Sequence, residues 1–63
     1  MKLKIKNGYL INPINIITKM KIDQGLPVYR VYATDSTGVS HLVTDKAFEK
    51  ENEALEYIET LEI

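Results

Sequence analysis

Hydrophobic and lysine residues alternate strictly along the start of the chain, which predicts a half-buried strand over residues 2–6. The lysine side of this strand consists of Lys2, Lys4 and Lys6. Asn7-Gly8 follows at once and favours a tight two-residue hairpin turn, so that Tyr9 to Ile11 begin a return strand. Asn12-Pro13 then interrupts the pairing, because proline lacks an N–H and restricts the residue before it.

Residues 14–22 form the longest alternating segment. Asn12 and Pro13 would also suit the start of a helix, so a helix over this segment is the alternative. Four of the nine residues are isoleucine and one is threonine, and β-branched side chains lose rotamer freedom in a helix. We therefore expect a strand, with Lys19 and Lys21 on its solvent side.

Residues 28–34 and 39–44 have the strongest β-propensity in the chain and predict a second hairpin. Between them, Asp35-Ser36-Thr37-Gly38 has the composition of a type I turn, with Asp first and Gly last. The preceding segment from Asp23 to Pro27 is rich in turn-forming residues.

Hydrophobic residues recur at helical spacing near the end of the chain, which predicts a helix over residues 52–61 with Asn52 as its N-cap. Glutamates occupy most of its remaining positions. Residues 45–51 allow either an early helical turn or an extended stretch that places Phe48 in the core.

The predicted fold class is α+β: a three- to four-stranded antiparallel sheet covered on one face by a single C-terminal helix, forming one small domain over residues 1–63. The alternation assigns the following side chains to the covered face: Leu3, Ile5, Ile14, Ile16, Met20, Ile22, Tyr29, Val31, Ala33 and Leu42, packed under Phe48, Leu55, Ile58 and Leu61.

Charge is distributed unevenly along the chain although the net charge is only −1. The first 22 residues carry five lysines and no acid, whereas the rest carries nine acids and three bases. If the strands form one sheet, the five lysines gather with Arg30 on the open face while the helix presents an acidic surface.

Several chemical functions find no support in these residues. The chain has no cysteine and one histidine, so neither a nucleophile–base pair nor a His/Cys metal set can be assembled. We expect no catalytic activity and no cofactor. The longest aliphatic or aromatic run, Tyr9 to Ile11, is far too short to span a membrane, and a cytoplasmic location is expected.

The leading functional hypothesis is a non-catalytic interaction module that self-associates or binds a protein partner through the open sheet face. The residues expected there are Val28, Arg30, Tyr32, Val39, His41 and Val43. The alternative is weak nucleic-acid binding through the lysine stripe of Lys2, Lys4, Lys6, Lys19 and Lys21. The net charge disfavours that alternative, because it gives little long-range attraction for a polyanion. The lysines can also be no more than the solvated side of two strands.

Overall fold

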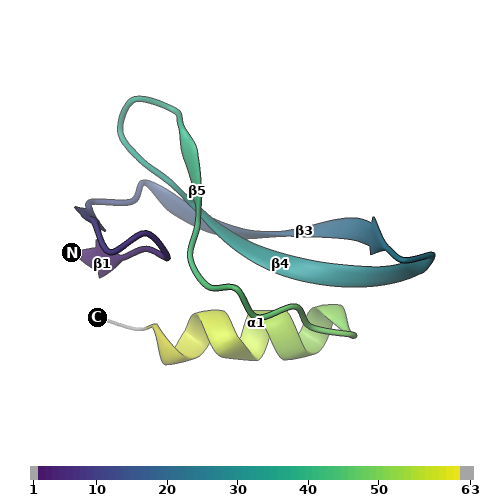
Figure 1. Cartoon of the computed structure of the whole chain (residues 1–63). Helices are drawn as coiled ribbons and strands as arrows, with labels where there is room; N and C mark the ends of the chain where they lie inside the picture. The colour runs from purple at the N-terminus through teal and green to yellow at the C-terminus, as the bar shows by residue number, and fades with distance from the viewer. Residues whose placement is uncertain (1, 62–63) are drawn as a thin grey trace.

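A computed structural model describes residues 2–61 and shows an α+β architecture of two small antiparallel sheets and one C-terminal helix (Figure 1). Strands β1 (Leu3–Lys4) and β2 (Leu10–Ile11) form the first sheet. The second sheet has the order β3-β4-β5, with β3 at Asn15–Asp23, β4 at Leu26–Thr34 and β5 at Ser40–Leu42. The fold class is thus confirmed, but the strands divide into two sheets.

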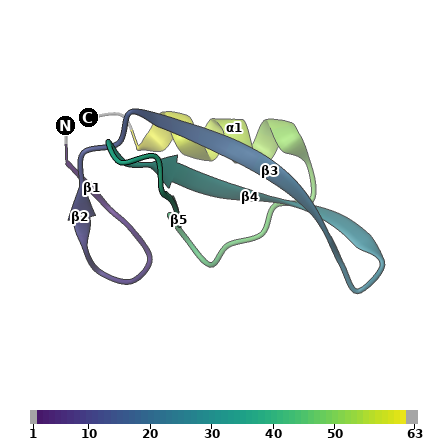
Figure 2. The same cartoon turned by 90° about the horizontal axis from the view of Figure 1, so that it is seen from above.

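The helix α1 (Glu51–Thr60) lies along one face of the β3-β4 hairpin, as seen from the side in Figure 1 and from above in Figure 2. It begins one residue earlier than expected, and its N-cap residue is Lys50, which forms no side-chain capping hydrogen bond. The prediction of Asn52 as N-cap was therefore wrong. The acidic first turn, with Glu51 and Glu53, still suits the positive end of the helix dipole.

The core lies between α1 and the sheets. Its buried side chains are Leu3, Ile5, Val31, Ala33, Val43, Phe48 and Ala54. Phe48 reaches this core from an extended segment, because its backbone exchanges two hydrogen bonds with Tyr29. Its ring packs against Tyr57 of α1 at a centroid distance of 5.4 Å. Of the two alternatives for residues 45–51, the extended one is confirmed.

The lengths of the hairpin turns determine which side chains face the core. Gln24 and Gly25 both have positive φ and form a two-residue turn between β3 and β4. The first hairpin instead has a three-residue loop over residues 6–8, because Ile5 N–H bonds to the Tyr9 carbonyl. The predicted two-residue turn at Asn7-Gly8 was wrong. The expected return strand is confirmed by the β1-β2 pairing. A further hydrogen bond, from the Lys6 N–H to the Leu42 carbonyl, links this hairpin to β5.

Candidate protein-interaction surface

The open face of the β3-β4-β5 sheet is the side not covered by α1, and its members follow from the strand register. Residues directly opposite each other in an antiparallel pair share a face. Val31 and Ala33 are fully buried on the helix side, so their neighbours in sequence face the other way. The open face consists of Asn15, Ile17, Lys19, Lys21 and Asp23 of β3, Leu26, Val28, Arg30, Tyr32 and Thr34 of β4, and Ser40 and Leu42 of β5.

Tyr32 lies at the centre of this face. Its ring is half-buried, and the ammonium groups of Lys19 and Lys21 lie 5.3 Å and 5.8 Å from the ring centroid. Both distances fall within the range of cation–π attraction. Arg30 adds a third cation and is held by a hydrogen bond of 3.1 Å from its Nη1 to the carbonyl of Asp45.

A shallow hollow of about 260 Å³ runs over the same face. It is lined by Lys21, Ile22, Asp23, Val28, Arg30, Tyr32 and Leu42. Apolar side chains, two cations and the carboxylate-bearing Asp23 therefore line one shallow hollow. This combination can take an apolar side chain of another protein beside a carboxylate that faces Lys21 or Arg30.

The expected interface residues divide between two faces. Val28, Arg30 and Tyr32 lie on the open face as expected. Val43 does not: it is only 6 % exposed, donates its N–H to the Val31 carbonyl and belongs to the core. His41 is directly opposite Ala33 and so lies on the same face of the sheet as Ala33, away from the open face. Leu42, which was expected inward, lies on the open face.

The loop between β4 and β5 explains this reversal. Asp35 N–H bonds to the Val39 carbonyl and Gly38 N–H to the Asp35 carbonyl, which leaves residues 36–38 as a three-residue loop. The predicted type I turn is present, but Gly38 adopts φ of 91° and adds a bulge residue. Because side chains alternate with period two, this one residue exchanges the two faces of β5.

Asp35 and His41 interact at the base of that loop. His41 Nε2 lies 2.7 Å from Asp35 Oδ2, and both side chains are partly buried. Asp35 Oδ1 accepts hydrogen bonds from the N–H groups of Thr37 and Val39 and from the Thr37 hydroxyl. The hydrogen bond with His41, followed by those with Thr37, holds the pKa of the Asp35 carboxyl well below its usual range. His41 therefore stabilises a turn and lies away from the open face.

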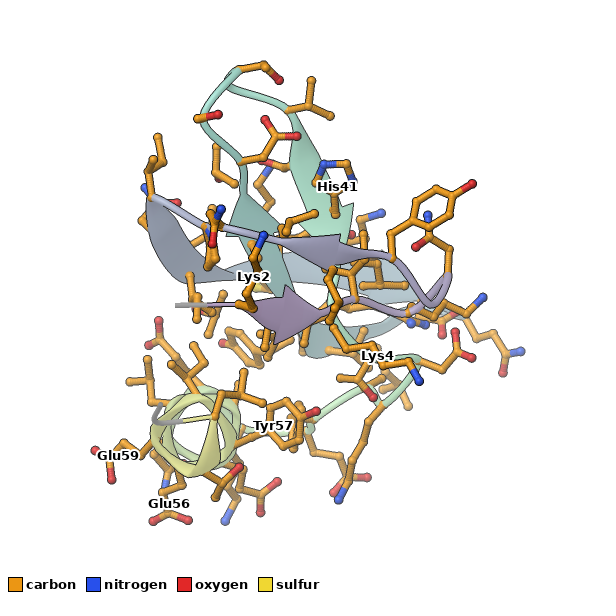
Figure 3. All side chains as sticks on the ribbon, turned by 90° about the vertical axis from the view of Figure 1, so that its left-hand side faces the viewer. Lys2, Lys4, His41, Glu56, Tyr57 and Glu59 are labelled. Atoms are coloured by element: carbon orange, nitrogen blue, oxygen red, sulfur yellow. The ribbon has the colours of Figure 1, made fainter. Side chains whose placement is uncertain are left out.

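The five lysines do not form one stripe. Lys4 lies on β1, and no Cα atom of β1 or β2 comes within 8 Å of one in β3. Lys2 and Lys4 project from the first hairpin in Figure 3, and Lys6 forms an ion pair of 3.3 Å with Asp45. Lys19 and Lys21 lie on the other sheet. The expectation of a single basic patch was wrong, because it placed the first strand in the same sheet as β3.

The helix carries the opposite charge. Its glutamates are exposed, and Glu56 and Glu59 point away from the sheets in Figure 3. An open groove of about 550 Å³ runs along its flank and is lined by Lys46, Ala47, Phe48, Glu49, Glu53, Glu56, Tyr57 and Thr60. Within residues 2–61, no three His, Cys, Asp or Glu side chains come together as a metal site would require.

Sequence reasoning missed the exposure of the outer half of the β3-β4 hairpin. Met20, Ile22 and Leu26 are 57 %, 66 % and 68 % exposed, although Met20 and Ile22 were expected under the helix. Ile14, also expected inward, is 66 % exposed, and Leu55 of the helix is 48 % exposed. The lengths of the elements explain this exposure, because a strand of nine residues extends about 30 Å whereas a helix of ten residues extends only about 15 Å. The helix is therefore too short to cover the whole hairpin.

Comparisons of the chain with models of known protein families, with curated proteins and with solved structures found no match. No helix within the described part of the chain has the length and apolar character needed to cross a membrane.

Proposed function

We propose that this protein is a small, non-catalytic interaction module that binds protein through the open face of its β3-β4-β5 sheet, in the cytoplasm. The observation that carries the proposal is the composition of that face. It combines the half-buried apolar side chains Ile17, Val28 and Leu42 with an aromatic centre at Tyr32. Aromatic and arginine side chains are enriched in the centres of protein interfaces, and Arg30 is the direct neighbour of this centre.

The occupant is a second copy of the chain or another protein. Charge favours another protein. Face-to-face contact of two copies would bring Lys19, Lys21 and Arg30 of each copy together, and like charges across an interface are unfavourable. An acidic surface would instead complement these cations.

The test compares two tyrosines. Tyr32→Glu introduces a charge at the centre of the open face, whereas Tyr9→Glu is a matched control on the first hairpin, where Tyr9 is 70 % exposed. A photo-crosslinking amino acid at either position should report what lies there in the source cell. We expect an adduct of one identified protein, or of a second copy, from position 32 only, and light scattering over a concentration series will separate the two.

Binding that is lost equally in Tyr32→Glu and Tyr9→Glu, or adducts formed equally from both positions, would contradict the proposal. Both variants should keep the amide dispersion of the folded chain, because neither tyrosine is a core residue.

Nucleic-acid binding is the second candidate, and one observation favours it: three cations lie beside an aromatic ring on the same face. Two features count against it. The two lysine ammonium groups already lie over the Tyr32 ring, where a base would stack, and the other three lysines of the expected stripe belong to the first hairpin. Titration of single- and double-stranded DNA and RNA at low salt tests this candidate.

A further inference from the structure

Along the outer edge of β3, several backbone N–H and C=O groups have no hydrogen-bond partner among residues 2–61. Asp23 and Leu26 flank a two-residue turn and form a hydrogen-bonded pair, and bonded and non-bonded pairs then alternate along the hairpin. Residues 16, 18, 20 and 22 fall in the non-bonded pairs, so their N–H and C=O groups point away from β4. The hydrogen bonds of Val31 and Tyr29 to Val43 and Phe48, on the far side of β4, agree with this alternation.

This edge is long, and within the described residues it is not paired with another strand. β3 has nine residues and pairs only with β4, and no other strand within residues 2–61 lies beside it. An exposed edge of this length is a template on which an extended segment can add as a further strand.

The side chains on the two faces of β3 differ in a way that specifies the added strand. On the helix side, Met20 and Ile22 are more than half exposed. Leu55 extends this apolar strip: Tyr57 packs against Phe48 beyond β4, and Leu55 lies on the opposite flank of α1, toward β3. On the open side, the same edge presents Lys19 and Lys21.

We propose that the β3 edge binds an extended segment of another protein in which apolar and acidic residues alternate. Its apolar residues cover Met20, Ile22 and Leu55, and its carboxylates lie opposite Lys19 and Lys21. This inference rests on the proposed function and specifies the partner's chemistry and its mode of docking.

The lysines also disfavour a second copy as the strand that adds. A symmetric antiparallel pairing of two β3 edges centred on residue 19 or 20 places a lysine directly opposite a lysine, which is unfavourable. A pairing centred on Thr18 still leaves the two copies of Lys19 as diagonal neighbours. Lysine on an exposed edge is a common protection against such self-pairing.

The experiment uses the whole chain and two synthetic peptides that are long enough to span β3. One alternates valine with glutamate, and the matched control has lysine in place of glutamate. Binding is measured by NMR together with amide hydrogen exchange. We expect only the glutamate peptide to bind, and we expect it to slow the exchange of the amides of Ile16, Thr18, Met20 and Ile22. The amides of the intervening residues are already bonded to β4 and should change little.

Two sets of variants test the charges and the edge separately. Reversing Lys19 and Lys21 to Glu should weaken binding of the glutamate peptide about tenfold or more and allow the lysine peptide to bind instead. Met20→Pro removes an outward N–H without removing a hydrogen bond of the hairpin and should abolish binding, whereas Met20→Ala should only weaken it. Hydrogen exchange of the wild-type chain decides the matter independently if Met20→Pro does not fold.

Three results would overturn the inference. The first is no binding of the glutamate peptide at millimolar concentration. The second is binding that perturbs Tyr32 without protecting the edge amides, which would leave the proposed function intact. The third is protection of the same amides in the wild-type chain alone as its concentration rises, which would identify a second copy as the occupant.

Discussion

The assignment of β5 side chains can be tested with two valines that lie four residues apart. Val43 is 6 % exposed and contacts the core cluster, whereas Val39 is 52 % exposed at the end of the β4-β5 loop. Alternation alone placed both on the open face. The structure places Val43 in the core, so truncation of these two side chains should have very different effects on stability.

The expected magnitude follows from the groups that are removed. Val43→Ala removes two buried carbons at about 0.8 kcal/mol each, and the cavity that remains raises the total to about 2 kcal/mol. Val39→Ala should cost less than about 0.5 kcal/mol, because the side chain is largely in water. At ~0.05 to 0.15 kcal/mol per residue, a chain of 63 residues has a free energy of unfolding of roughly 3 to 9 kcal/mol. The loss at Val43 is thus a large share of the total.

Urea unfolding followed by circular dichroism measures both variants. With a slope of about 1 kcal/mol per molar urea, Val43→Ala should lower the midpoint by about 2 M, and the melting temperature by roughly 8 to 16 °C. Val39→Ala should leave both close to the wild-type values. Equal shifts in the two variants, or a larger shift at Val39, would refute the register of β5.

Three further predictions concern other parts of the molecule. Gly25→Ala should lower the free energy of unfolding by about 1 to 2 kcal/mol in thermal unfolding, because Gly25 has φ of 82°, which disfavours any residue with a Cβ. No clash adds to this cost, because an added Cβ would meet no other atom within 4 Å. The pKa of Asp35 in the folded chain lies below its ordinary value of 3.8, so its ionised carboxylate contributes fully to stability above that pH and contributes less as the pH falls further. Asp35→Asn should therefore be less stable than the wild type at neutral pH and should lose less stability than the wild type in acid, as measured by urea midpoints. If nucleic acid binds through Lys19, Lys21 and Arg30 alone, the slope of log affinity against log salt should be roughly −2 to −3, whereas the undivided five-lysine stripe would give roughly −3.5 to −4.5.

The strands and the helix could be predicted from the sequence because their patterns are local. Residues 14–22 alternate with period two, and the end of the chain changes to helical spacing, so both elements were identified within a few residues. The inward assignment of Val31 and Ala33 followed from the same alternation and is confirmed by their complete burial.

The loops limited the prediction of the site. Gly8 and Gly38 each add a residue with positive φ after a turn, and each converts an expected loop into a three-residue loop. A single additional loop residue exchanges the faces of the following strand, which is why Leu42 and Val43 were assigned the wrong way round. The composition around Gly38 contained this signal, because a type I turn that ends in glycine is the usual start of a three-residue hairpin loop.

The strength of the complex at the β3 edge can be bounded from the same geometry. Covering the exposed parts of Met20, Ile22 and Leu55 would contribute about 1 kcal/mol each, given that full burial of such a side chain is worth ~1.5 to 3 kcal/mol. Each backbone hydrogen bond to the edge adds a net ~0.5 to 1.5 kcal/mol. Association and ordering of an extended peptide cost ~4 kcal/mol or more. A flexible peptide should therefore bind weakly, in the micromolar to millimolar range. The same segment held rigid on a folded partner should bind more tightly, because it is already ordered before it binds and loses less conformational entropy.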